Sequence, residues 1–376
     1  MIRQNFNADW TVEKGDGNSR MNSFLGNTQT KTVHLPYDAM IHEARTPDTK
    51  NGAQTGFYPG GEYIFQKHFT APQAWQGKPV SLVFEGVYQT ALVYLNGWLL
   101  TRNVNGYAEF TVEAGPYLKY GADNLLKVIA DNSLEPNSRW YTGSGIYRPV
   151  RLLVGNKVYL PQDTVRITTR EADEGFALLD VTAQVQSAST VTERVTLQQT
   201  ICREGTAVLT DRQTLLLQPG ESRTVSFRYC VDSPALWSPE NPNLYTSTMQ
   251  VLEGEEELDR EETSFGIRTL SIDAAHGVRI NGQTVKLRGA CIHHDNGILG
   301  AATLPDAEER RIRQLKEAGF NAIRSSHHPA GRALLDACDR YGVLVMDELS
   351  DVWNVRKNPY DYALYFEQDW KPTIQK

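Results

Sequence analysis

Chemically active side chains gather at three places in the last third of the sequence. His293-His294-Asp295 follows one apolar stretch, Arg324-Ser325-Ser326-His327-His328 closes a second, and Asp347-Glu348 closes a third. Imidazole, guanidinium and carboxylate groups bind polar substrates, and imidazole and carboxylate groups also transfer protons. If the stretches are successive parallel strands, their carboxyl ends meet at one face, where barrels and doubly wound sheets carry their sites. The spacing therefore predicts an active site at this face.

Each group taken alone also has a simpler explanation. An exposed histidine pair is often part of a solvated loop, and Asp347-Glu348 could cap a helix. The four histidines could instead bind zinc, provided that three or four ligands converge with fixed geometry, and the chain would then be a zinc-dependent hydrolase. Cys338 lies at the core-facing phase of a predicted helix, so we interpret it as a packing residue rather than a nucleophile.

The elements that must position these groups alternate between strands and helices. We predict strands over 285–290, 321–324 and 343–347. A helix over 305–319 stops at Gly319. A second helix carries Leu334 and Cys338 on one face and stops at Gly342. Strand, helix, strand, helix, strand indicates parallel βαβ units.

The first 268 residues consist of short strands without a long helical pattern. Asn96-Gly97 lies between two apolar runs and predicts a hairpin, because both residues tolerate positive φ, and Asn281-Gly282 predicts another farther on. The expected strands are 63–69, 80–85, 91–95, 98–100, 125–130 and 150–154, then 176–185, 194–201, 224–229 and 244–252. We predict a jelly-roll sandwich over 1–155, an immunoglobulin-like sandwich over 156–268 and a βα segment over 269–376.

The composition is that of an ordinary folded protein with several domains. The chain has 376 residues, 40% of them hydrophobic, and a net charge of −7. This balance excludes disorder and argues against nucleic acid as a partner. No signal-like apolar segment opens the chain and no run of about 18 apolar residues occurs, so we expect no membrane partner and a cytoplasmic location. The four cysteines are dispersed, so free thiols are expected.

Several of these stretches resemble the glycoside hydrolases of family 2, the β-galactosidase and β-glucuronidase group. The first matches are Arg139-Trp140-Tyr141 with the Gly145–Val150 stretch, which resembles the end of the family's sugar-binding jelly roll, and Phe265-Gly266-Ile267-Arg268, which resembles the exit of its immunoglobulin-like domain. The later matches are Leu287-Arg288-Gly289 with His293, then 319–327, 338–342 and 345–348. The resemblance covers the chain in domain order. It implies that residues 269–376 form about the first three βα units of a (β/α)8 TIM barrel.

The resemblance also implies roles for individual residues. His293 and His327 match histidines that contact sugar hydroxyls, and Arg324 matches an arginine that supports the nucleophile region. Arg139 and Trp140 match a loop that the jelly roll lends to the pocket edge, where Trp140 either stacks on a sugar or is simply buried core. Glu348 follows the strand where β-galactosidases place a carboxylate near a metal and is a weak candidate ligand. No cofactor is expected to be required, although the complete parent enzyme could hold Mg or Na.

This sequence departs from the family pattern at one point, and that departure decides whether we expect the chain to be active. Retaining glycosidases use two carboxyl groups about 5–5.5 Å apart, and in this family they follow strands four and seven of the barrel. The acid/base lies in an Asn-Glu pair, which this sequence lacks, so we expect the acid/base and nucleophile glutamates to lie beyond Lys376. We therefore expect the N-terminal part of a retaining, exo-acting hydrolase of terminal β-linked sugars, most simply β-galactosides, without either catalytic glutamate and inactive alone.

Three alternatives to this interpretation are open. The parent enzyme could have β-glucuronidase specificity, or the chain could be a non-catalytic carbohydrate-binding or scaffold protein. An uncovered sheet edge at 343–346 could also make the chain a homo-oligomer.

Overall fold

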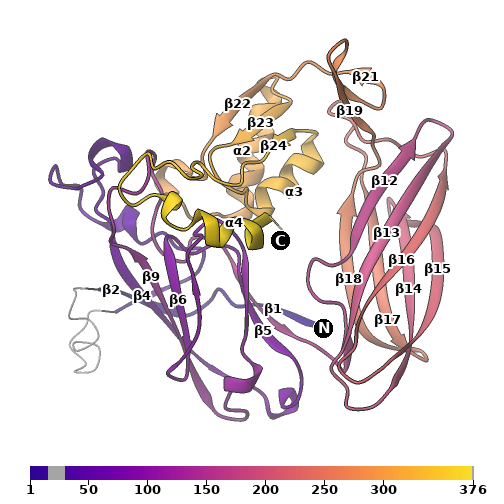
Figure 1. Ribbon diagram of the computed structural model, residues 1–376, viewed down its shortest axis with the longest axis horizontal. Coiled ribbons are helices and arrows are strands. Elements are labelled where there is room, and N and C mark those ends of the chain that lie inside the picture. Colours follow the sequence, from indigo (N-terminus) through magenta and orange to yellow (C-terminus); the bar gives the residue numbers. More distant parts are fainter. Residues whose placement is uncertain (16–29, 375–376) are drawn as a thin grey trace.

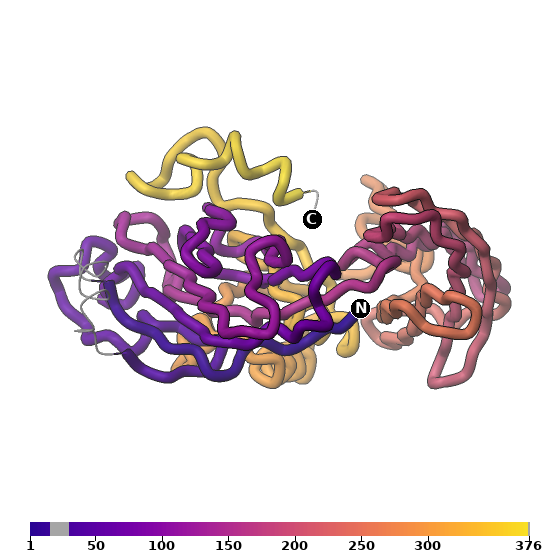
Figure 2. Tube along the Cα trace, turned by 90° about the horizontal axis from the view of Figure 1, so that it is seen from below, coloured from indigo at the N-terminus to yellow at the C-terminus, as the bar shows by residue number. Residues whose placement is uncertain are grey.

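The computed structural model of the chain describes residues 1–15 and 30–374. Lys376, beyond which we expect both catalytic glutamates, lies outside the described residues, so that expectation stays a prediction. Figure 1 shows two β-sandwiches beside one another and a smaller βα unit that lies above the first sandwich. Figure 2 shows the molecule from below, with the second sandwich standing to one side. The mainly β architecture confirms the predicted fold class.

Among the described residues, no helix has the length and apolar character needed to cross a membrane.

The first sandwich packs a six-stranded antiparallel sheet against a four-stranded one. The larger sheet has the order β3 (Lys31–Val33), β2 (Trp10–Lys14), β4 (Gly61–Thr70), β9 (Asp123–Asn132), β6 (Thr90–Leu95), β7 (Trp98–Asn103). The smaller has the order β1 (Ile2–Asn5), β10 (Val150–Val154), β5 (Val80–Phe84), β8 (Phe110–Glu113). Asn96 and Gly97 join β6 to β7 with φ values of 51° and 90°, which confirms the predicted hairpin turn.

The second sandwich is also built from two antiparallel sheets. One contains β11 (Val158–Tyr159), β12 (Arg166–Ala172), β13 (Phe176–Ser187) and β16 (Ser222–Asp232). The other has the order β15 (Thr206–Leu217), β14 (Glu193–Arg203), β17 (Tyr245–Glu253), β18 (Glu256–Phe265). Along β13 every second residue is buried, as expected for a strand with one face on the core.

The βα unit follows a short antiparallel sheet and has the predicted alternation. The antiparallel sheet contains β19 (Leu270–Asp273), β20 (Gly277–Ile280) and β21 (Gln283–Thr284). The βα unit contains β22 (Gly289–Ile292), α2 (Pro305–Glu317), β23 (Ala322–Ser325), α3 (Arg332–Tyr341), β24 (Leu344–Met346) and α4 (Phe366–Ile374). The strands β22, β23 and β24 pair in parallel. Their carboxyl ends therefore meet at one edge, as predicted.

The strand predicted over 285–290 is misplaced, because β22 begins at Gly289. Val285 still belongs to the preceding hairpin, since its amide donates to the Val278 carbonyl at 2.8 Å. At Gly289 a Cβ atom would lie 2.9 Å from the Ala322 carbonyl oxygen, so the parallel pairing begins where a small residue allows close approach. The apolar residues from Val285 onward predicted a strand in the first half of the segment 285–292, but the strand forms in its second half.

Candidate functional site

The rings of Trp140, His293 and His327 form one cluster, which we call the histidine–tryptophan cluster. The His293 imidazole stacks on the Trp140 indole with ring centroids 5.4 Å apart and an interplanar angle of 7°. The His327 ring lies 5.2 Å from the indole and 5.5 Å from the His293 ring. The histidines follow β22 and β23, whereas Trp140 comes from a loop of the first sandwich. The fold thus joins residues that lie more than 150 positions apart in the sequence.

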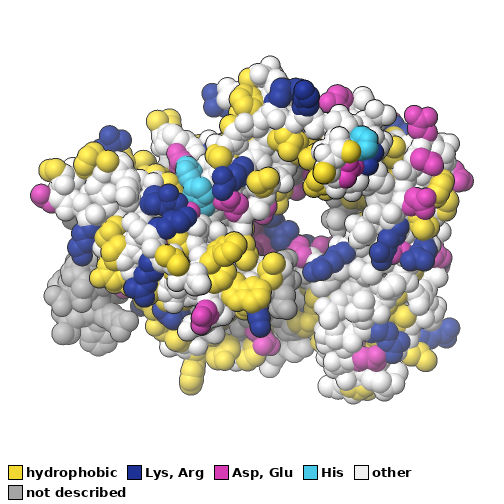
Figure 3. Space-filling model, turned by 45° about the horizontal axis from the view of Figure 1, so that its top comes forward, with side chains coloured by type: hydrophobic (Ala, Val, Ile, Leu, Met, Phe, Trp, Pro, Cys, Tyr) yellow, Lys and Arg dark blue, Asp and Glu magenta, His cyan; other side chains and the backbone are white. Residues whose placement is uncertain are grey.

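The two cluster histidines are oriented by hydrogen bonds. The Nδ1 atom of His293 lies 2.6 Å from the Ser326 carbonyl oxygen and donates to it, which leaves Nε2 as the nitrogen that can face a ligand. The Nδ1 atom of His327 lies 3.1 Å from Oε2 of Glu348. Both imidazoles are half-buried, so part of each ring can be reached by a polar ligand. Figure 3 shows that, on one face of the molecule, exposed histidine side chains lie beside charged groups.

Two carboxylates border the cluster, and each is paired with cations. Glu348 accepts from Arg324, whose Nε lies 2.6 Å from Oε1, and Glu348 raises the pKa of this guanidinium. Asp351 accepts from Arg139 at 2.6 Å and from Lys357 at 2.9 Å. The structure thus brings the predicted Arg139, Arg324 and Glu348 to the cluster. Asp351 and Lys357 complete these pairs, although no sequence pattern pointed to them.

The surroundings of Glu348 do not fit a metal ligand. Its two oxygens already contact the guanidinium of Arg324 and the imidazole of His327, and a nearby guanidinium repels a cation. Among residues 1–15 and 30–374, no group of three His, Cys, Asp or Glu side chains has an arrangement that could hold a metal ion. We therefore assign no metal to this carboxylate.

The other two histidines lie beneath the cluster rather than in it. The His294 Nδ1 and His328 Nε2 atoms are 3.1 Å apart, and His294 Nε2 lies 2.9 Å from the Thr142 carbonyl oxygen. Burial lowers the pKa of His294 to about 3 and the pKa of His328 well below its ordinary value. Both rings are therefore neutral structural groups. Of the four predicted histidines, only His293 and His327 form the cluster.

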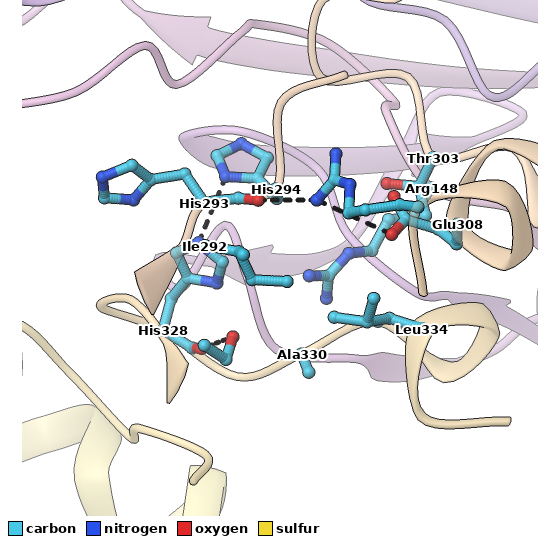
Figure 4. A pocket seen from close by; sticks show the side chains of 12 residues that line it. Arg148, Ile292, His293, His294, Thr303, Glu308, His328, Ala330 and Leu334 are labelled. Carbon is cyan, nitrogen blue, oxygen red and sulfur yellow. Dashed lines mark hydrogen bonds and ion pairs between the residues drawn. The ribbon is translucent and has the colours of Figure 1, made fainter. Parts of the chain in front are cut away.

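A small polar cavity lies against this buried pair. Figure 4 shows His294 and His328 bonded to each other, with Arg148 and Glu308 across the cavity and the His293 ring pointing away from it. Its volume of about 10 Å³ is close to that of one water molecule. This space is too small for a sugar ring.

Trp140 is largely buried, while its proposed stacking on a sugar stays a prediction. Its side chain is only 7% exposed, and its Nε1 donates to the Tyr107 hydroxyl at 3.1 Å. It shares a buried cluster with Tyr88, Tyr107, Tyr147 and Ala301. One indole face is covered by His293, so Trp140 supports the histidines and offers a ligand only its remaining edge.

Comparison with known proteins places these features in one family. The family model of the glycosyl hydrolase 2 galactose-binding domain-like region matches residues 10–176, that of glycosyl hydrolases family 2 matches 158–268, and that of the family's TIM barrel domain matches 274–362. The chain therefore belongs to glycosyl hydrolase family 2.

Individual relatives carry two different sugar specificities in their names. The chain is 38% identical to the β-galactosidase BoGH2A of Bacteroides ovatus, over 97% of this chain and 43% of the relative. It is 26% identical to a β-glucuronidase of Formosa agariphila, over 96% of this chain and 40% of the relative. A crystal structure of a family 2 member from Bacteroides cellulosilyticus has a TM-score of 0.95, with 36% identity over 100% of this chain and 49% of that one. The chain spans less than half the length of these proteins.

Proposed function

We propose that this chain is the N-terminal, sugar-binding part of a retaining, exo-acting hydrolase of terminal β-linked sugars. The observation that carries this proposal is the histidine–tryptophan cluster at the carboxyl ends of β22 and β23, bordered by Glu348 and Asp351. The imidazoles and the bordering carboxylates can hydrogen-bond to sugar hydroxyls, and the edge of Trp140 adds a little apolar surface. The family membership supports the same reaction class.

We propose β-galactosides as the substrate class because of the charges around the cluster. A glucuronide carries a carboxylate, which calls for a cation that is not already neutralised. Arg139 and Lys357 both contact Asp351, and Arg324 contacts Glu348. Each of these three cations already contacts a carboxylate, although Arg139 and Lys357 share one, so a glucuronate carboxylate would have to compete with Asp351 or Glu348 for them. The β-glucuronidase alternative requires that one of these pairs opens.

We propose that the chain alone does not hydrolyse glycosides. A retaining hydrolase needs two carboxyl groups that face the substrate. Glu348 and Asp351, which border the cluster, are instead held in ion pairs with Arg324, Arg139 and Lys357. Lacking an Asn-Glu pair, the sequence offers no match to the family's acid/base.

Binding of free sugars tests the proposed site and its specificity. We expect galactose to bind more tightly than glucuronate in isothermal titration, and His327→Ala to abolish the galactose signal. The control is Trp98→Ala, which removes an indole that is 66% exposed on the first sandwich and should leave binding intact. Loss of binding in the Trp98 variant instead would support a carbohydrate-binding module that uses the sandwich surface. Tighter binding of glucuronate would overturn the galactoside assignment.

A further inference from the structure

Tyr107 contacts both of the chain segments that build the histidine–tryptophan cluster. It lies in the segment 104–109 between β7 and β8, which we call the Tyr107 loop, and is 3% exposed. Its hydroxyl accepts the Trp140 Nε1 proton at 3.1 Å. Its ring stacks on His328 with centroids 4.1 Å apart and an interplanar angle of 11°. One side chain thus touches the sandwich loop that carries Trp140 and the barrel loop that carries His327.

The Tyr107 loop is itself tied to both domains. The Tyr107 carbonyl accepts from Nη1 of Arg148 at 2.6 Å, and Nη2 of the same guanidinium donates to the Pro329 carbonyl at 3.0 Å. The Tyr107 amide donates to the Asn105 side chain at 3.0 Å. Because Arg148 is buried and bonded to both loops, a shift of one loop must disturb the other.

We propose that Tyr107 is a positioning residue that sets the Trp140 indole against His293 and holds the 326–329 loop so that His327 faces the sugar. This inference rests on the proposed sugar-binding function of the cluster. Tyr107 does not touch the ligand. Its hydroxyl fixes the rotation of the indole, while its ring fixes His328, the neighbour of His327. Loss of the hydroxyl should therefore change the positions of the cluster rings, while the Tyr107 ring itself still fills its place in the core.

The variant Tyr107→Phe separates this role from simple core packing, because it keeps the ring and removes only the hydroxyl. We expect a shift of the Trp140 signal in fluorine NMR of protein labelled with 5-fluorotryptophan, the signal being assigned from its absence in Trp140→Phe. We also expect galactose affinity to weaken about three- to tenfold, the range for loss of one buried hydrogen bond.

The matched control is Tyr245→Phe in the second sandwich. Tyr245 is also buried, and its hydroxyl accepts the Ala235 amide at 2.9 Å, far from the cluster. We expect this variant to lose stability to a similar extent, with the Trp140 signal and galactose affinity unchanged. If wild-type protein binds galactose and Tyr107→Phe changes neither readout, the positioning role is wrong. If wild-type protein binds no sugar, the proposed function fails first and the positioning role with it.

Discussion

Histidines that are neighbours in the sequence have opposite environments in this fold. His293 and His327 are half-buried beside Trp140, while His294 and His328 are fully enclosed beneath them. An imidazole with one ring nitrogen left without a protein partner suits contact with a sugar hydroxyl. A buried imidazole pair suits the joining of two loops. We therefore propose that His293 and His327 contact the ligand, while His294 and His328 support the structure.

The buried pair predicts a loss of stability in mild acid. Unfolded histidines have a pKa of about 6.5, whereas burial lowers the pKa of His294 to about 3 in the folded chain. Below pH 6.5 the unfolded chain therefore binds protons that the folded chain does not bind. The contribution of the neutral buried histidines to the unfolding free energy is complete above pH 6.5 and is lost as the pH falls. At pH 5 each such histidine should lower the unfolding free energy by about 2 kcal/mol.

Urea unfolding at pH 7 and pH 5 measures this effect. The variant His294→Gln should show a smaller difference between the two pH values than the wild type. His276→Gln is the control, because His276 is exposed on the β19–β20 hairpin. Equal pH differences in wild type and His294→Gln would show that the pair does not titrate as described.

At the scale of elements, α2 and α3 each cover the sheet of the βα unit with one apolar face. Ile312 of α2 and Leu334, Ala337 and Cys338 of α3 pack with Ile323 and Val343 in one core. This packing holds β22 and β23 in register, and their ends then present His293 and His327 together. The burial of Cys338, which is 1% exposed, confirms that it is a packing residue.

The reactivity of the thiols tests this packing. Burial raises the pKa of Cys338 to about 12, so little thiolate forms at pH 8 and reagent cannot reach it. Cys230 and Cys291 are exposed. We expect these two to react rapidly with Ellman's reagent, while Cys338 reacts only after unfolding. The variant Cys338→Ala should lack that late reaction, and rapid labelling of Cys338 in the native chain would contradict the packing of α3.

Several of the strands that the sequence predicted have a buried face with strict alternation. β6, β13 and β14 show it, and an Asn-Gly turn marks the β6–β7 hairpin. The missed strands include β15 and β18, which are largely exposed. They are stabilised by pairing with β14 and β17. The residue pattern of β15 or β18 alone does not indicate that pairing.

In the candidate site, too, some residues could be predicted from the local sequence, whereas others could be recognised only by their contacts in the folded chain. His293, Arg324, His327 and Glu348 could be predicted because they follow apolar strands. Trp140 and Arg139 could be named only from the family resemblance. Tyr107 and Asp351 were missed because their importance comes from contacts more than 30 residues away in the sequence.

At the scale of the whole molecule, one guanidinium joins three parts of the chain. Arg332 at the start of α3 forms a two-point contact with Glu109 of the first sandwich, at 2.8 and 3.0 Å. It also contacts Asp163, next to the second sandwich. This ion-pair group lies in a groove of about 1080 Å³ at the junction of the three domains. We infer that it fixes the angle between them.

Removal of this guanidinium should loosen the junction. Arg332→Gln leaves Glu109 and Asp163 without their shared cation, and because the site is partly exposed we expect a loss of about 1 kcal/mol. Urea unfolding measures the free energy of unfolding, and limited proteolysis measures how readily the chain is cleaved at the junction of the domains. Arg313→Gln is the matched control, since it removes only a surface pair with Glu317 on α2. Identical behaviour of the two variants would contradict the joining role.

We expect self-association at the outer edge of β24. In the described part of the chain, β24 ends the order β22-β23-β24, and Met346 on it is exposed. Such an edge can pair with another chain. Light scattering at increasing concentration should show a rising mass, which Met346→Lys should reduce. A constant monomer mass in the wild type would contradict this expectation.

We propose that the chain binds a β-galactoside without cleaving it, and ligand-observed NMR of nitrophenyl β-galactoside tests both parts in one sample. We expect saturation transfer to the sugar protons that disappears in His327→Ala, together with no nitrophenol above the buffer blank. Steady release of nitrophenol, or a binding signal that survives in His327→Ala, would contradict this proposal.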